Sequence, residues 1–231
     1  MKNAGLSDSF GKDGSDSGVF LFPDMRITAI GLDFEDQARA DGFLFIAGVD
    51  EVGRGCLAGP VVAGACILDT SRPLPKGLND SKKLTPKMRE EIGAELKQYA
   101  IAHSVGQIEA DEIDQINMLE ATKKAMLMAI ANLAISADFL LIDALQLKQS
   151  PLPQKAIIKG DSISASIAAA SILAKTYRDN LMVEYDREYP EYGFAGHKGY
   201  GAATHFAAIR KYGACPLHRI SFRGVLPPES S

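Results

Sequence analysis

Two apolar segments on either side of a glycine-rich turn constrain the fold more than any other part of the chain. Residues 43–51 (FLFIAGVDE) and 59–69 (GPVVAGACILD) are rich in small and β-branched residues, a composition typical of strands. The first segment ends in Asp50 and Glu51, and the glycine–arginine–glycine turn 53–55 follows. A carboxylate at the end of an apolar strand is costly unless another charge compensates it. The two acids and the turn that follows them therefore form a candidate functional site.

The rest of the chain mixes strand and helix patterns. Further strands are predicted at residues 101–108, 138–143 and 155–161, and helices at residues 33–41, 85–100, 111–134, 164–189 and 201–212. Thr85 and Pro86 are typical of a helix start, and Gly213 is typical of a helix end. Strands mixed with helices predict an α/β domain.

Composition limits the class of protein. The 231 residues are 46% hydrophobic, which is enough for a sizeable core. No apolar run reaches the roughly 18 residues that a membrane span needs, and no signal-peptide pattern begins the chain. The three cysteines form no C-x-x-C pair, so we expect reduced thiols and a cytoplasmic protein. Residues 1–18 are rich in Gly, Ser and Asp, and they predict a disordered part of an N-terminal extension, residues 1–33.

Charge is unevenly distributed along the chain. The formal net charge is −4, and residues 1–42, with four Lys/Arg and eight Asp/Glu, account for it. Residues 192–228 contain five Lys/Arg and no acid. Such a basic segment favours a partner with a phosphate backbone, although a solvated basic face explains it equally well.

The turn also matches a dinucleotide-binding pattern. Residues 53–58 (GRGCLA) fit G-x-G-x-x-A, but that motif needs a helix directly after it to face the pyrophosphate. Pro60 and an apolar, strand-like run follow instead. A nicotinamide-dependent dehydrogenase is therefore disfavoured.

Two further acids occupy similar positions. Asp143 and Asp161 each end a predicted strand, so both can meet Asp50 and Glu51 at one edge of a sheet. Oxygen ligands of this kind suit Mg²⁺ or Mn²⁺, and four carboxylates can hold two ions about 4 Å apart. Alternatively, Asp161 caps the following helix and Asp143 belongs to a turn. Neighbouring strand residues point to opposite faces, so Asp50 and Glu51 can share a site only if the strand ends or bulges there.

Several motifs in order carry a resemblance to a known family. They are AGVDEVGRGCLAGPVVAGA (47–65), LNDSKKLTPKMRE (78–90), INMLEATKKAM (116–126), LLIDAL (140–145), KGDSISASIAAASILAKTYRD (159–179) and GFAGHKGYGAATH (193–205). Together they resemble bacterial ribonuclease HII, a type 2 ribonuclease H, across residues 34–223. The resemblance implies a ribonuclease H-like mixed sheet flanked by helices, with a C-terminal helical segment. It places the catalytic domain at residues 34–225 and a short tail at 226–231.

The resemblance also implies an activity. The family cuts the RNA strand of RNA–DNA hybrids, and it cuts on the 5′ side of single ribonucleotides in duplex DNA, leaving 3′-hydroxyl and 5′-phosphate ends. The residues that match its catalytic, metal-binding carboxylates are Asp50, Glu51, Asp143 and Asp161. They imply a site for two Mg²⁺ or Mn²⁺ ions.

The remaining matches concern substrate binding. The residues implied to approach the ribonucleotide 2′-hydroxyl or to pack on the next deoxyribose are Gly53, Arg54, Gly55 and Tyr200. Lys82, Lys83 and Lys198 are expected to contact phosphates, with solvated lysines as the alternative. His103, His205 and His218 are predicted to be structural or surface residues, and nothing indicates that His197 is catalytic. A monomer is expected, and no clamp-docking motif is present. A non-catalytic duplex-binding protein is the competing hypothesis.

Overall fold

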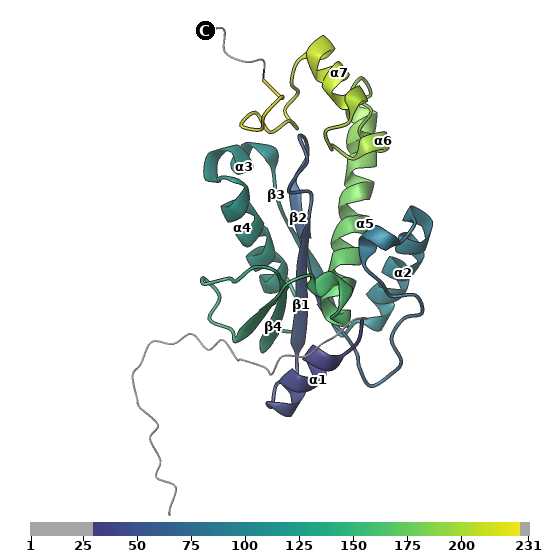
Figure 1. Cartoon of the computed structure of the whole chain (residues 1–231), viewed down its shortest axis with the longest axis vertical. Helices are drawn as coiled ribbons and strands as arrows, with labels where there is room; N and C mark the ends of the chain where they lie inside the picture. Colours follow the sequence, from purple (N-terminus) through teal and green to yellow (C-terminus); the bar gives the residue numbers. More distant parts are fainter. Residues whose placement is uncertain (1–29, 227–231) are drawn as a thin grey trace, which may run out of the picture.

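A mixed five-stranded sheet forms the centre of the computed structural model, which describes residues 30–226 (Figure 1). The strands are β1 (Ile46–Val52), β2 (Val61–Ile67), β3 (Ala102–Ile108), β4 (Phe139–Asp143) and β5 (Gln154–Ile157). Their order in the sheet is β3-β2-β1-β4-β5. The β1–β2 and β2–β3 pairs are antiparallel, whereas the β1–β4 and β4–β5 pairs are parallel. The predicted α/β class with a mixed sheet is confirmed.

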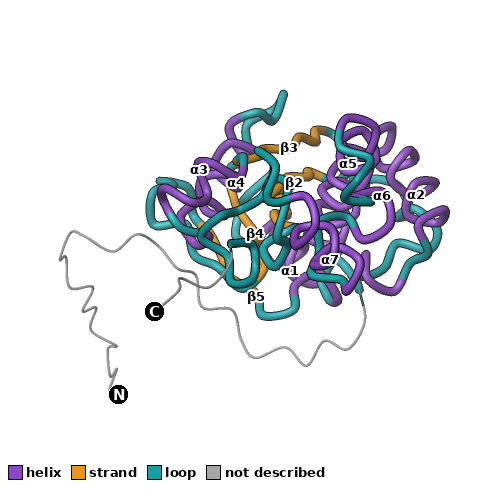
Figure 2. The backbone as a smooth tube through the Cα atoms, turned by 90° about the horizontal axis from the view of Figure 1, so that it is seen from above, coloured by secondary structure: helices purple, strands orange, loops and turns teal. Residues whose placement is uncertain are grey.

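Helices cover both faces of this sheet. The α-helices are α1 (Asp33–Ala40), α2 (Pro86–Tyr99), α3 (Ala110–Ile116), α4 (Met118–Ala131), α5 (Ala165–Glu188), α6 (Phe194–His197) and α7 (Ala203–Tyr212). Two short 3₁₀ helices, η1 (Ser81–Lys83) and η2 (Gly160–Ser162), lie in loops. α3 and α4 lie on one face of the sheet, and α5 with α2 lies on the other (Figures 1 and 2).

Small residues let α5 approach the central strands closely. A Cβ atom at Gly48 of β1 would lie 2.0 Å from the carbonyl carbon of Ser166, and one at Gly64 of β2 would lie 2.3 Å from the carbonyl oxygen of Ala170. Both separations are far inside van der Waals contact, so glycine is required at these two positions. The close approach holds β1, which carries Asp50, against the N-terminal part of α5.

The opposite face packs in the same manner. α4 buries Ala121, Ala125 and Met126 against apolar side chains of β1, β2 and β4. A Cβ atom at Gly106 of β3 would lie 2.3 Å from the carbonyl oxygen of Ala125, so β3 and α4 are also in backbone contact. The sheet is thus held between two tightly packed helices.

The helix predicted over residues 111–134 is in fact two helices. Asn117 separates α3 from α4 and has φ of 70°. Asparagine tolerates this left-handed region better than most residues do. Its side-chain oxygen accepts hydrogen bonds from the backbone N–H groups of Leu119 and Glu120 and so caps α4. The apolar periodicity continues through the break, which is why the pattern suggested one helix.

The strand predicted over residues 155–161 was also wrong in its second half. β5 ends at Ile157, and Lys159 adopts a left-handed backbone (φ 57°) that starts η2. The short helix α6 was not predicted, because four residues leave no periodic pattern. The last helix ends before Gly213 as expected.

Residues 1–29 and 227–231 lie outside the described residues, so the predicted disorder of residues 1–18 and most of the predicted tail fall there. Residues 30–33 are described. Gly31 donates its backbone N–H to Ile163 and accepts a hydrogen bond from Ala165, which joins the start of the described chain to α5. Within residues 30–226, no helix has both the length and the apolar character that crossing a membrane requires.

Candidate active site

Strands β1 and β4 bring two of the predicted acids together. The strands are parallel neighbours, and Val49 pairs with Ile142 directly before Asp50 and Asp143. Parallel strands end at the same edge of a sheet, so the two carboxylates meet there. Pairing with β4 stops at Val49, which leaves one side of β1 open next to the acids.

Asp161 reaches this edge from η2 rather than from a strand. The Asp143 carboxylate accepts a hydrogen bond of 2.7 Å from the backbone N–H of Gly160, which links the end of β4 to the start of η2. Asp161 does not cap α5, because the hydroxyl of Ser164 accepts the hydrogen bond from Ile167 N–H at that position. The side chain of Asp161 is instead paired with Lys82, whose Nζ lies 2.7 Å from its Oδ2.

Asp50 and Glu51 are consecutive residues near the end of β1, which stops at Val52. β1 keeps regular antiparallel pairing with β2 through Glu51 and Val52, without a bulge. Burial is the largest cause of the raised pKa of both acids, and the negative charge of Asp143 adds to it in each case. Both carboxylates therefore lie within electrostatic reach of Asp143 even though their strand positions face opposite sides.

Burial dominates the electrostatics of these acids. The pKa of Asp50 is raised well above its usual value by burial and by the charges of Glu51 and Asp143. A hydrogen bond from the Ser171 hydroxyl lowers this pKa and so offsets part of the shift. Burial likewise raises the pKa of Glu51, although Arg54 opposes the shift, and it raises the pKa of Asp143. Ionising this group of carboxylates is costly without a cation.

The residues present fit a divalent cation. All four side chains offer carboxylate oxygens, the ligands that Mg²⁺ and Mn²⁺ prefer. Glu51 Oε2 is buried and has no hydrogen-bond partner. Among residues 30–226, no three His, Cys, Asp or Glu side chains converge closely enough to form a complete cage. In this arrangement, the ammonium group of Lys82 supplies positive charge next to Asp161.

Replacing Lys82 should strengthen metal binding in the absence of substrate. Its Nζ competes for Asp161, and the hydrogen bond to Asp161 raises the pKa of Lys82. Lys82→Met should bind Mn²⁺ about two- to fivefold more tightly, the range set by a largely exposed ion pair of under about 1 kcal/mol. Calorimetric titration measures this, with Lys83→Met as the matched exposed control. Equal or weaker binding by Lys82→Met would contradict a competing role.

The glycine loop, residues 53–60, begins where β1 ends. Gly53 and Gly59 have φ of 90° and 80°, and a Cβ at Gly53 would lie 2.3 Å from Arg178 Nε. Glycine is therefore structurally required at Gly53 and favoured by the backbone at Gly59. Gly55 differs, because it lies outside the left-handed region, it is exposed, and a Cβ there would meet nothing within 4 Å. The fold itself does not explain why Gly55 is a glycine.

Tyr200 lies beside the glycine loop, in a second loop that comprises residues 198–202. The backbone N–H of Leu57 donates to the Gly199 carbonyl at 2.8 Å, which joins the two loops. Burial raises the pKa of Tyr200 to about 12, so its hydroxyl stays protonated at neutral pH. The guanidinium carbon of Arg178 lies 6.0 Å from the centre of the Tyr200 ring.

Two buried histidines support this second loop. Cys215 N–H donates to His218 Nδ1, so His218 carries its proton on Nε2 and donates it to His205 Nε2 at 3.1 Å. His205 then donates from Nδ1 to the Tyr200 carbonyl at 2.9 Å. Burial lowers the pKa of His205 to about 4, so it is neutral in this arrangement. The prediction that both histidines are structural agrees with these contacts.

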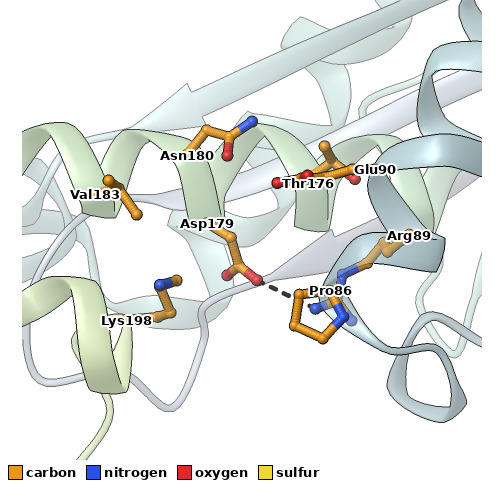
Figure 3. A pocket seen from close by; sticks show the side chains of 8 residues that line it. All are labelled: Pro86, Arg89, Glu90, Thr176, Asp179, Asn180, Val183 and Lys198. Atoms are coloured by element: carbon orange, nitrogen blue, oxygen red, sulfur yellow. Dashed lines mark hydrogen bonds and ion pairs between the residues drawn. The ribbon is translucent and has the colours of Figure 1, made fainter.

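The three predicted phosphate-contacting lysines do not form one group. Lys82 faces the acids, and Lys83 is exposed next to it. Lys198 lines a different pocket of about 120 Å³ between α2 and α5, where Arg89 pairs with Asp179 at 3.5 Å (Figure 3). Its ammonium group donates to the Ala195 carbonyl. Lys198, the only one of the three that belongs to the basic segment 192–228, therefore lies in a different setting from Lys82 and Lys83.

Fold and acidic edge together define a ribonuclease H-like nuclease. The crystal structure of the ribonuclease H2 from Pyrococcus horikoshii OT3 matches with a TM-score of 0.68 and 27% identity, over 79% of this chain and 95% of that chain. A ribonuclease HIII crystallised in complex with Mn²⁺ shares the fold at 20% identity, with a TM-score of 0.59 over 79% of this chain and 68% of that chain.

The sequence comparisons identify the family. The model of the ribonuclease HII family matches residues 47–225. The ribonuclease HII of Chlamydia caviae is 58% identical over 193 residues, which cover 83% of this chain and 90% of that protein. The chain belongs to the ribonuclease HII family, and it is therefore an endonuclease with ribonuclease H activity on RNA–DNA hybrids.

Proposed function

We propose that this chain cuts the RNA strand of RNA–DNA hybrids and also cuts duplex DNA on the 5′ side of a single embedded ribonucleotide. We infer two-metal-ion hydrolysis that leaves 3′-hydroxyl and 5′-phosphate ends. One observation carries the proposal: a buried group of carboxylates lies next to a glycine loop that has an open position at Gly55. The acids suit hydrolysis, and the open glycine suits close approach of a ribose.

The acidic residues hold the ions in this proposal. Asp50, Glu51, Asp143 and Asp161 are the ligands, and the unpartnered Glu51 Oε2 supports their assignment. Mg²⁺ or Mn²⁺ held by these residues would supply the positive charge needed to activate a water and to stabilise the leaving oxygen. The Mn²⁺ in the ribonuclease HIII of the same fold is consistent with this choice of metal.

The two loops recognise the substrate. The residues assigned to the 2′-hydroxyl side are Gly53, Arg54 and Gly55, and Tyr200 packs on the neighbouring deoxyribose. The 2′-hydroxyl is the group that distinguishes RNA from DNA at one position. Lys82, Lys83 and Lys198 contact phosphates of the duplex. The expected monomeric state and cytoplasmic location stay predictions.

A labelled DNA duplex that contains one ribonucleotide tests this function. With Mg²⁺, the protein should cut on the 5′ side of the ribonucleotide and leave an all-DNA duplex intact. A long RNA–DNA hybrid serves as the positive control for hydrolysis. Cleavage of the hybrid without cleavage at the single ribonucleotide would retain the nuclease but reject recognition of a lone ribose by the two loops.

A further inference from the structure

Two fully buried arginines lie beneath the loops assigned to substrate recognition. Arg178 of α5 and Arg219, which follows α7, are each 0% exposed. Neither takes part in an ion pair found among residues 30–226. Buried arginine is rare without a carboxylate partner, because burial of an uncompensated charge is costly. Burial lowers the pKa of Arg219 to about 10, so this side chain remains charged at neutral pH.

Both guanidinium groups donate to backbone carbonyls. Arg219 donates from Nη1 to the Arg54 and Cys56 carbonyls at 3.0 and 2.8 Å, and from Nε and Nη2 to the Gly59 carbonyl at 3.0 and 2.8 Å. The planar group holds several peptide units of the glycine loop at once. An ammonium group lacks this planar set of donors.

Arg178 joins the glycine loop to the loop that carries Tyr200. Its Nε and Nη2 donate to the Pro60 and Ala58 carbonyls at 2.9 and 3.0 Å. Its Nη1 donates to the Lys198 carbonyl at 2.9 Å. This side chain therefore links the two loops in addition to the hydrogen bond between Leu57 and Gly199.

The hydrogen bond from Arg219 to the Arg54 carbonyl also orients the N–H group of Gly55. The carbonyl and N–H of one trans peptide unit point in opposite directions. Since the Arg54 carbonyl points inward to Arg219, the Gly55 N–H points away from it. This N–H donates no hydrogen bond within the described part of the chain, and the space next to Gly55 is open. The loop thus presents an unused donor at an exposed position.

We propose that Arg219 and Arg178 are positioning residues for ribonucleotide recognition, holding the Gly55 N–H toward the ribose 2′-oxygen and Tyr200 at a fixed place beside it. The inference rests on the proposed function, and it assigns recognition to two side chains that do not touch the substrate. A hydrophobic side chain fills such a volume without a buried charge, so the particular contribution of the guanidinium is orientation.

Binding measurements separate orientation from general stability. In Ca²⁺, the affinity of the full-length protein is measured by fluorescence anisotropy for a duplex with one ribonucleotide and for the all-DNA duplex. Arg219→Lys and Arg178→Lys should lose about tenfold in preference for the ribonucleotide, the value of one hydrogen bond, while affinity for all-DNA duplex is unchanged. Arg89→Lys is the matched control, because Arg89 is a buried arginine that donates to the Ser81 carbonyl outside these loops. It should keep the wild-type preference.

Each outcome bears on one hypothesis. If the wild-type protein itself shows no preference for the ribonucleotide, the proposed function fails at recognition. If the wild type shows the preference and both arginine variants retain it, the positioning role is rejected. Hydrogen exchange on the wild-type protein provides a test that needs no variant. The Gly55 N–H should exchange rapidly in the free protein and become protected by the ribonucleotide duplex but not by all-DNA duplex. Equal protection by both duplexes would overturn the proposal.

Discussion

Asp50→Asn should abolish hydrolysis and, at the same time, stabilise the metal-free protein. If Asp50 binds metal as proposed, its loss should lower the rate by about three orders of magnitude, or about 4 kcal/mol of transition-state stabilisation. The variant should nevertheless unfold at a higher urea concentration, because its neutral amide removes a buried charge next to Glu51 and Asp143. Cleavage of a labelled RNA–DNA hybrid and urea unfolding in EDTA measure the two effects.

The gain in stability should depend on pH. The folded-state pKa of Asp50 is raised, so burial penalises folding only when the carboxyl is ionised. The penalty is absent below the unfolded pKa of about 4, grows as the pH rises above that value, and becomes constant once the pH exceeds the folded pKa. Asp50→Asn should therefore exceed the wild type in stability at pH 8 and match it near pH 4.

Asp69→Asn is the control for this experiment. Hydrogen bonds from Ser71 lower the pKa of Asp69, so that replacement should cost stability at neutral pH and leave cleavage intact. A wild-type rate for Asp50→Asn would remove Asp50 from the site. Equal stability of variant and wild type at pH 8 would show that a cation or water compensates the charge even in EDTA.

Gly55→Ala should lower cleavage at a single ribonucleotide about 10- to 100-fold without loss of stability. The added methyl group meets no protein atom within 4 Å and requires no change of φ. It occupies space that the proposed function assigns to the ribose, and such overpacking costs about 1–3 kcal/mol. Rates on the ribonucleotide-containing duplex and thermal unfolding together measure the effect.

Replacements of two other glycines serve as controls for Gly55→Ala. Gly53→Ala should destabilise the protein, because φ is 90° and the methyl would meet Arg178. A Cβ at Gly196 also meets nothing within 4 Å and its φ is ordinary, but it lies in α6 and outside the glycine loop, so Gly196→Ala should change neither quantity. Unchanged cleavage by Gly55→Ala would mean that the substrate does not approach this position.

Local patterns predicted the strands that carry the acids better than the segment that carries Asp161. β1 is apolar and rich in small or β-branched residues, and β4 is a short apolar run that ends at Asp143, so both indicate strands without any tertiary information. Asp161 depends on a left-handed backbone at Lys159, a residue that gives no local signal for it. Its approach to the other acids arises from the Gly160 hydrogen bond to Asp143, a contact across 17 residues.

The arginines could not have been placed from composition. Arg178 and Arg219 lie in segments that also contain exposed cations, and arginine is almost always exposed. Their partners are carbonyls up to 165 residues away in the sequence, and a carbonyl carries no residue-specific signal. The small residues before Arg178 in α5 do indicate close packing of the helix, but they do not indicate what its second half contacts.

The close packing of α5 on β1 also sets the spacing between Asp50 and the glycine loop. Gly48 adjoins Ser166, Asp50 is hydrogen-bonded by Ser171, and Gly53 adjoins Arg178. From the first contact to the last, five strand residues span about 17 Å and twelve helix residues about 18 Å, so strand and helix advance together. The acids and the glycine loop are therefore held at a fixed spacing by the packing of α5 on β1. In the proposed mechanism, the scissile bond is then selected by the length of the protein backbone, whatever bases surround the ribonucleotide.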